Sequence, residues 1–533
     1  MGRYMVFMMV AGLTALSLFA AAFNSWFLIP FLLFSGFTIL GIRDVVQPRH
    51  AILRNYPVIG HMRFLFEGIR PEIRQYLIES DQDEEPFSRD ARSLIYQRAK
   101  GVEDKRPFGT RQRVYDSGYQ WITHSVAPKH IEDHDFRTTV GGSECKQPYE
   151  ASIYNISGMS YGALSANAIL ALNTGANKGG FAHTTGEGGI SRYHKEGGGD
   201  LIYQIGSGYF GCRTSEGRFD PDKFTKVTAN PQVKMIEVKL SQGAKPGHGG
   251  VLPAAKITPE IAEARDVPMG EDCISPARHP EFETPIELCQ FLGRLRDLSG
   301  GKPVGLKMCI GHRREFMCLV KAMLETDIVP DFIVVDGKEG GTGAAPVEFA
   351  DHLGMPLTEG LTFVHNTLRG VNLRHRLKIG ASGKITSAFD LARIIALGAD
   401  WANSARGYMF SIGCIQAQAC HTNHCPVGVA TQDPLRQRAL NVPIKSERVY
   451  RFHNNTMHAL AEMTGAAGLD HPSQFLPHHL LIREKDADMK TGDEVYPYLP
   501  EGFLLRNEEV GGGYMKRWER ARAESFAPVD YIP

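Results

Sequence analysis

The middle of the chain alternates short runs of β-branched and other apolar residues with stretches of helical periodicity. The candidate strands lie at 153–156, 182–184, 201–205, 235–240, 304–308, 332–335, 377–379 and 401–403. Strands that alternate with helices are typical of βαβ units and a parallel sheet. Eight is the strand number of a closed (β/α)8 barrel, and nearly every run leads into a Gly-rich or charged corner, where such barrels place their active sites. The pattern therefore predicts an α/β fold built on a TIM barrel.

Two longer apolar runs, at 5–23 and 26–42, open the chain and contain no charged residue. The first is long enough to span a bilayer, and the second lies at the short end of that range. Arginines flank the pair on both sides: Arg3, Arg43, Arg49 and Arg54. The positive-inside rule then predicts a transmembrane hairpin with both ends in the cytoplasm, which would anchor a cytoplasmic catalytic domain. The alternatives are a signal peptide cleaved at the alanines of 20–22 and a buried helical hairpin.

These patterns divide the chain into four predicted parts. They are a transmembrane hairpin at 1–44, a connector and cap at 45–148, the barrel at 149–440 and a C-terminal extension at 441–533. The extension is expected to be helical, with its clearest helical pattern at 449–465.

Composition narrows the class of protein only a little. Lys plus Arg and Asp plus Glu both number 59, so no overall field favours nucleic acid. Nine cysteines, an odd number, argue against a disulfide framework and for a reducing compartment. Six of them have no ligand spacing and are expected in the core: Cys145, Cys212, Cys273, Cys289, Cys309 and Cys318.

Two consecutive corners follow the last two predicted strands. Both are rich in Gly, Ser and Ala, and both place bare backbone N–H groups beside helix starts, which suits a phosphate. In a TIM barrel the phosphate site lies after strands seven and eight. The candidate phosphate-binding residues are Gly380, Ser382, Gly383, Ser404, Ala405 and Arg406.

Three cysteines, Cys414, Cys420 and Cys425, crowd into one short segment directly behind these corners. Thiols at such spacing indicate a soft metal. The alternatives are packed free thiols and a zinc site completed by His421 or His424.

The cysteine segment ends in CHTNHCPVGVATQ, and together with the corners upstream it resembles the FMN-binding synthase domain of the glutamate synthase large subunit. The resemblance covers roughly 149–432, with several motifs in the same order. It implies FMN on the barrel and a [3Fe–4S] cluster held by the three cysteines, in a stand-alone, membrane-anchored form of the domain.

The same resemblance assigns the flavin site. It implies that a turn at 157–160 contacts the ring, that Gln204 bonds the flavin pyrimidine, and that Lys307 lies beside N1. The segment DGKEGGTGAAP at 336–346 would flank the ribityl chain and phosphate. The implied residues are Ser157, Gly158, Met159, Ser160, Gln204, Lys307, Asp336, Gly341 and Gly343.

A cationic corner carries the predicted substrate site. One cation for each carboxylate and a third for the keto oxygen are what a 2-oxo diacid requires. The resemblance implies that Lys239, Lys245 and Arg265 bind 2-oxoglutarate and that Glu187 contacts the amino or imino group. His248 and Val251 depart from the family pattern, where an acid and a substrate-binding amide stand, which leaves the oxo acid open. The alternatives are solvated lysines and an Arg265 on the surface of a helix.

One motif is rejected. The segment 206–211 reads G-x-G-x-x-G after a strand, but 212–219 shows no helical pattern, so a nicotinamide fold is not predicted.

The resemblance implies an oxidoreductase acting on CH–NH2 groups, which aminates a 2-oxo acid reductively with ammonia or an amine. Neither an N-terminal nucleophilic cysteine nor a pyridine nucleotide module is visible, so ammonia is expected from solution or a separate subunit. Electrons are expected from ferredoxin or another protein. Rival hypotheses are a membrane-linked amine or amino-acid dehydrogenase, an N-alkylglutamate synthase, and a non-catalytic electron-transfer flavoprotein.

Overall fold

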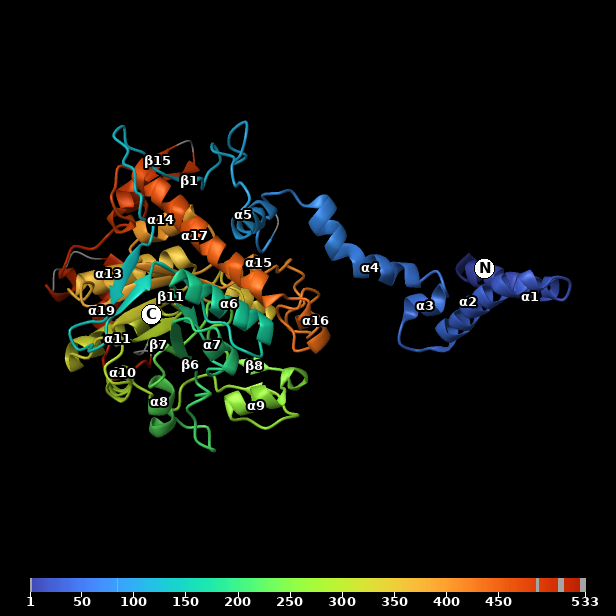
Figure 1. The fold of residues 1–533 in the computed structure, drawn as a ribbon, viewed down its shortest axis with the longest axis horizontal. Helices are drawn as coiled ribbons and strands as arrows, with labels where there is room; N and C mark the ends of the chain where they lie inside the picture. Colours follow the sequence, from blue (N-terminus) through green and yellow to red (C-terminus); the bar gives the residue numbers. More distant parts are fainter. Residues whose placement is uncertain (1, 84, 486–487, 507–511, 528–533) are drawn as a thin grey trace. The chain divides into compact units, whose positions relative to one another are not determined.

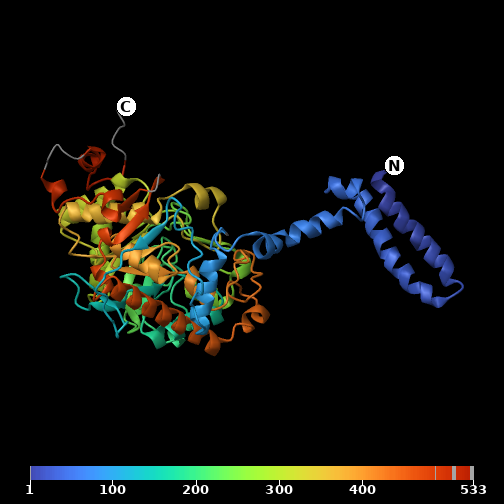
Figure 2. The ribbon, with the colours of Figure 1, turned by 90° about the horizontal axis from the view of Figure 1, so that it is seen from above.

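The computed structural model describes residues 2–83, 85–485, 488–506 and 512–527. The chain divides into two compact units, Met1–Asp90 and Ala91–Pro533 (Figures 1 and 2). The division falls inside the expected connector at 45–148, and the four-part organisation stays a prediction.

The second unit is built on a closed barrel of eight parallel strands. In barrel order they are β4 (Tyr154–Ile156), β5 (His183–Thr184), β6 (Leu201–Ile205), β7 (Val233–Lys239), β10 (Val304–Met308), β11 (Phe332–Asp336), β12 (Lys378–Ser382) and β13 (Trp401–Ser404), which pairs back onto β4. Every predicted strand is present, so the predicted TIM barrel is confirmed.

The largest difference at a strand end occurs in β12. β12 continues to Ser382 instead of ending at residue 379, because its backbone keeps pairing with β11 and β13. Gly380 therefore lies inside the strand, opposite Trp401. A Cβ there would stand 2.7 Å from the indole ring, so the missing side chain makes room for a buried tryptophan.

Helices surround the barrel, as Figure 1 shows. Those between and beside the barrel strands are α6 (Ala166–Gly179), α7 (Arg192–Glu196), α8 (Pro221–Thr228), α9 (Pro259–Arg265), α10 (Pro285–Leu298), α11 (Arg313–Thr326), α12 (Val347–His352), α13 (Leu357–Gly370), α14 (Ala388–Ala396) and α15 (Arg406–Ser411). Their starts follow local sequence rules. Thr284 with Glu287, and Ser387 with Asp390, form capping boxes at α10 and α14.

The C-terminal extension packs against the barrel. Its long helix α17 (Val442–Ala466) lies along α6 and starts earlier than the predicted 449, because Asn441 caps it and Pro443 occupies its first turn. α16 (Pro434–Arg438) lies just before the extension, and α18 (Gly492–Val495) and α19 (Gly512–Arg520) follow α17 among its described residues.

Three small sheets lie outside the barrel. β1 (Gln120–Ile122) pairs with β14 (Leu480–Arg483), which pairs with β15 (Met489–Thr491). β2 (Arg137–Val140) pairs with β3 (Tyr149–Ser152), and β8 (Val251–Leu252) with β9 (Cys273–Ile274). The first of these sheets joins the segment before the barrel to the extension after it.

Five of the six cysteines expected in the core are buried, but Cys145 is only half-buried. Its Sγ lies 3.3 Å from the carbonyl oxygen of Gly301, in a loop outside the barrel helices, so placing it in the core was wrong.

The first unit begins with two antiparallel helices, α1 (Met5–Ala21) and α2 (Leu28–Val46). Among the described residues, Gly2–Ala21 and Ser25–Val46 are long and apolar enough to cross a membrane, with mean hydropathy of 2.0 and 1.9. Only 11% and 6% of these stretches are buried, which does not support the alternative of a buried hairpin. Then follow α3 (Ala51–Asn55), α4 (His61–Ile73) with a π-helical turn at Arg74–Ile78, and α5 (Arg89–Lys100), which enters the second unit.

Buried histidines make the second unit sensitive to acid. Burial lowers the pKa of His194 and His453 to about 3, and that of His365 to about 4. Between about pH 6.5 and these lowered pKa values, the unfolded chain therefore binds more protons than the folded chain, so the free energy of unfolding decreases as the pH falls. Each histidine contributes about 1.4 kcal/mol for every unit by which folding lowers its pKa. We expect the midpoint of thermal unfolding to drop steadily from about pH 7 to pH 5. His453→Gln should give a shallower slope, and an equal slope would contradict this origin.

Candidate active site

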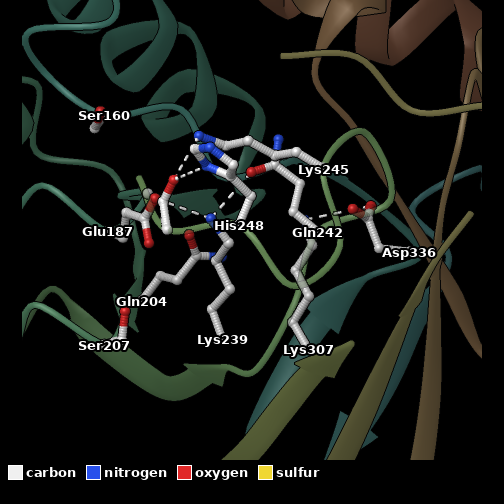
Figure 3. Close-up of polar contacts among 12 residues, drawn as sticks. Ser160, Glu187, Gln204, Ser207, Lys239, Gln242, Lys245, His248, Lys307 and Asp336 are labelled. Carbon is white, nitrogen blue, oxygen red and sulfur yellow. Dashed lines mark hydrogen bonds and ion pairs between the residues drawn. The ribbon is translucent and has the colours of Figure 1, made fainter. Parts of the chain in front are cut away.

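The predicted site residues gather at the carboxyl ends of the barrel strands. Figure 3 shows side chains from several neighbouring corners of this rim pointing toward a common space. The corners follow β4, β5, β6, β7, β10 and β11, so residues far apart in sequence become neighbours because all eight strands run the same way.

An ion pair lies at the centre of this group. The Nζ of Lys239, the last residue of β7, stands 2.9 Å from Oε1 of Glu187 and also donates to Oε1 of Gln242 at 3.0 Å. The two charged side chains are only 12% and 18% exposed, so water screens the pair weakly. Lys239 is thus fixed at the rim with its charge directed into the pocket (Figure 3).

Two further cations face the same carboxylate. Burial would raise the pKa of Glu187, but Lys239, Lys245 and Arg265 together lower it below its usual value. Lys245 is buried, donates to the carbonyl oxygen of Gly249 at 3.1 Å, and has its pKa lowered by burial and by Lys239. One carboxylate faces three cations, so the site carries a net positive charge suited to a dianion.

Arg265 connects the cationic corner to the predicted flavin turn. Its Nη2 donates to Oγ of Ser160 at 3.2 Å and to the carbonyl oxygen of Tyr161 at 3.3 Å. The guanidinium also lies 5.3 Å from the centre of the Phe210 ring. Arg265 is therefore buried and oriented, which argues against the alternative of a solvated surface residue.

Below the cations, four polar side chains form the floor. Gln204 donates to Oε1 of Glu237 at 2.5 Å, and Lys307 pairs with Oδ1 of Asp336 at 3.4 Å. All four are buried. Burial alone would lower the pKa of Lys307, but the carboxylates of Asp336 and Glu237 raise it, so the ammonium stays charged.

The turn at 157–160 lies directly against this floor. Gly158 packs so closely on Gln204 that a Cβ would stand 2.9 Å from the amide nitrogen. Ser157 and Met159 are buried, and the backbone N–H of Ser157 donates to the carbonyl oxygen of Ser404 at 3.0 Å. The turn is therefore joined to the corner that follows β13.

The predicted phosphate corners lie where β12 and β13 end. Ser382 is the last residue of β12, Gly383 follows with φ of 155°, and Ser404 donates its hydroxyl to the carbonyl oxygen of Ile385 at 2.7 Å. Ala405 precedes α15. Arg406 is the first residue of α15, and its side chain donates to the carbonyl oxygen of Thr342 at 2.9 Å and approaches Sγ of Cys420 at 3.8 Å.

The segment at 336–346 reaches from the floor to the cysteine loop. A Cβ on Gly341 would stand 3.2 Å from Nε of Arg406, and one on Gly343 would stand 3.8 Å from Cβ of Cys420. Arg406 therefore links the two predicted cofactor regions.

The three cysteines are close enough to interact. Burial, and then the charges of Cys420 and Cys425, raise the pKa of Cys414. Cys414 and Cys425 are buried, whereas His421 and His424 are exposed. Within the part of the chain that the structure describes, no three His, Cys, Asp or Glu side chains converge on a single-ion site. A zinc ion requires such convergence, whereas in a polynuclear cluster each thiolate binds its own iron.

Two residues of the floor and rim were missed as site residues by the sequence analysis. Glu237 lies two positions before Lys239, and strand alternation places both on the inner face, so the signal was present. Gln242 lies three residues after Lys239 in the same corner.

Two other residues gave no usable signal, because their partners are distant in sequence. The Nε2–H of His279 donates to the carbonyl oxygen of Lys239 at 2.8 Å, and its Nδ1 shares a hydrogen bond with the Tyr209 hydroxyl at 2.9 Å. Lys256 is buried and donates to the carbonyl oxygen of Cys420 at 2.8 Å.

The rejected G-x-G-x-x-G segment forms turns, and the next helix starts only at Pro221. Its first glycine has a different use. A Cβ on Gly206 would stand 2.3 Å from Oε2 of Glu187, so the glycine makes room for the carboxylate of the pocket.

Gly243 joins the cationic corner to the floor. Its N–H donates to Oδ2 of Asp336 at 2.7 Å, and a Cβ would stand 1.8 Å from the carbonyl oxygen of Gly337. Gly243→Ala must push the corner outward, so we expect flavin affinity to fall about tenfold or more, measured by fluorescence titration. Gly311→Ala, where a Cβ meets nothing within 4 Å, is the control. Equal affinity in both variants would contradict this role.

A closed parallel barrel whose rim combines a shielded cation cluster with buried polar side chains is the arrangement of a (β/α)8 enzyme. Comparison makes the class more specific. A family model described as a conserved region in glutamate synthase matches residues 128–470. The chain belongs to this family and is a glutamate synthase-like flavin oxidoreductase.

Relatives support the assignment. The chain is 39% identical over 508 residues to the glutamate synthase large subunit-like protein YerD of Bacillus subtilis (strain 168), covering 88% of this chain and 96% of that protein. It is 35% identical over 316 residues to the archaeal-type glutamate synthase [NADPH] of Thermotoga sp. (strain RQ2), covering 58% of each. The chain thus spans little more than half the length of that relative.

Among solved structures, a flavocytochrome b2 mutant with pyruvate bound aligns over 88% of this chain and 99% of that chain. The two are 13% identical, with a TM-score of 0.42.

Proposed function

We propose that this protein aminates 2-oxoglutarate, or a closely related 2-oxo diacid, reductively with ammonia or an amine. The observation that carries the proposal is the convergence of Lys239, Lys245 and Arg265 around one carboxylate at the barrel rim. Two carboxylates and a keto oxygen present three negative or partially negative groups, and three oriented cations match them in number and sign.

The chain's own residues would bind and polarise the substrate. A cation at the keto oxygen favours attack by ammonia at the neighbouring carbon and stabilises the charge that develops on oxygen. Glu187, held ionised by its three cationic neighbours, can accept hydrogen bonds from the ammonium or iminium nitrogen. A substrate carboxylate would compete with Glu187 for Lys239, so binding should loosen this ion pair.

The rim also suits FMN. Gly158 lets the backbone of the turn approach the Gln204 amide closely. Gln204 offers both a donor and an acceptor, and Lys307 is a buried cation at the strand end. Ser382, Gly383, Ser404 and Ala405 would hold the phosphate. When bound, the flavin supplies the hydride that reduces the imine carbon.

The cysteine loop suits a [3Fe–4S] cluster that would relay electrons from ferredoxin or another protein donor. Its donor set is three thiols, and Arg406 and Lys256 lie beside it as cations. Positive charge beside thiols favours the thiolate form that iron binds. The apolar hairpin of the first unit would tether the enzyme to a membrane with its catalytic unit in the cytoplasm.

Two measurements test the proposal together. Protein isolated without oxygen should show flavin absorbance and a cluster signal in EPR, and protein that stays colourless after addition of FMN would contradict it. Turnover of 2-oxoglutarate with ammonia and with methylamine, driven by reduced ferredoxin, would then identify the nitrogen donor. Oxidation of glutamate without measurable amination would instead favour a dehydrogenase.

A further inference from the structure

The helix α4 and the π-helical turn after it form an amphipathic surface in the first unit. Met62, Leu65, Phe66, Ile69 and Ile73 recur at the spacing of one helix face, and Tyr76 and Leu77 continue it. The opposite face carries the charged residues Arg63, Glu67, Arg70 and Arg74. Seven apolar side chains thus share one side of a helix that is charged on the other.

This apolar face is uncovered. No residue of α4 is buried among the residues that the structure describes. Leu65 and Phe66 are 55% and 57% exposed, and Leu77 is 80% exposed. A helix of this length whose apolar face is left uncovered is only marginally stable in water, so a further surface is needed to hold it.

Contacts within the first unit fix the start of α4 beside the end of α2. Asp44, buried near the end of α2, accepts from the N–H of Val58 at 2.9 Å and bonds Nε2 of His61 at 2.9 Å. His61 is the first residue of α4. The amphipathic helix is therefore held at the charged end of the apolar hairpin.

The charge of this region identifies the occupant. Between residues 43 and 78 the sequence contains six arginines and three acidic residues, so it is net positive. Basic residues beside an apolar helix face attract anionic lipid headgroups, while the face itself enters the acyl boundary. We propose that α4 and its π-helical turn lie in the membrane interface, with Phe66 and its neighbours inserted among anionic lipids.

This inference rests on the proposed membrane tether and adds a second attachment to it. A hairpin alone would leave the chain free to swing about its last residue. An interfacial helix that starts next to that residue restricts the chain to the membrane surface over the length of α4.

The test is amide hydrogen exchange of residues 62–78 in the full chain, reconstituted in nanodiscs of phosphatidylglycerol and phosphatidylethanolamine. We expect exchange to be about tenfold slower in the natural protein than in Phe66→Glu, because a charge on the inserted face opposes burial. Phe64→Glu is the matched control, since Phe64 lies on the charged side of the same helix, and its exchange should stay within about twofold of the natural protein. Nanodiscs of phosphatidylcholine alone should give weaker protection.

Equal exchange in the natural protein and Phe66→Glu would overturn the inference. Protection seen only when a nanodisc holds two chains would also overturn it, because the face would then be covered by a second copy. Failure of the tether looks different: the protein would be released from membranes by alkaline washing. A chain that resists washing but exchanges rapidly in 62–78 refutes the interfacial helix and leaves the tether standing.

Discussion

Replacing Lys239 by alanine is expected to reduce turnover of the 2-oxo acid by about 10²- to 10³-fold, the loss typical for removing one oriented group that stabilises developing charge. Lys239 is the cation closest to Glu187, at 2.9 Å, and its removal also takes positive charge from the site of the substrate carboxylates. Flavin absorbance should be unchanged, because the floor residues Gln204 and Lys307 do not depend on this contact. Steady-state amination with reduced ferredoxin or a chemical reductant measures the effect.

Lys234→Ala is the matched control for this experiment. Lys234 lies on the same strand but at its opposite end, where it pairs loosely with Asp200 at 3.7 Å. Its removal should leave turnover within about twofold, as for most surface substitutions. A Lys239→Ala enzyme with full amination activity would exclude the proposed substrate site. A natural protein that passes electrons but shows no amination would instead favour a non-catalytic electron-transfer role.

Cys425→Ser is expected to abolish the cluster signal in EPR and the turnover supported by ferredoxin, because a serine oxygen is a poor ligand for iron–sulfur clusters. Turnover with a small chemical reductant of the flavin should survive, since the barrel rim keeps its contacts. Cys145→Ser is the control, because this cysteine is half-buried in a loop outside the cysteine segment.

The same pair of variants separates the three interpretations of the cysteines. A zinc site would be indicated if the natural protein contains zinc and gives no EPR signal, and if Cys425→Ser contains no zinc. Natural protein without metal, and with properties unchanged by Cys425→Ser, would indicate packed thiols.

The barrel could be predicted because its strands are buried on both sides. Runs such as those of β6 and β11 are buried along their whole length and mostly apolar, and every gap between runs is long enough for a crossover helix. Strand limits were harder, because β12 continues through glycine and serine that look like a turn. What keeps it extended is pairing with β11 and the space that Gly380 gives to Trp401, and neither is visible from local sequence.

The candidate site was predictable where a strand ends in a charge, as at Lys239, or where several glycines cluster. It was not predictable where a residue acts through a distant partner. His279 lies 40 residues from Lys239 in sequence, yet its ring is hydrogen-bonded to the Lys239 carbonyl oxygen. The side chain of Arg406 contacts Thr342 and approaches Cys420, and neither contact follows from its place after β13.

The pairing of β1 with β14 has a consequence for how the protein is made. Gln120 meets Ile482 in that sheet, so the edge beside Trp121 has no partner until almost the whole chain has left the ribosome. By then the apolar N-terminal helices have long left the ribosome. Expression fragments that stop after the barrel would carry this strand edge permanently open, and they should aggregate even though every barrel strand is present.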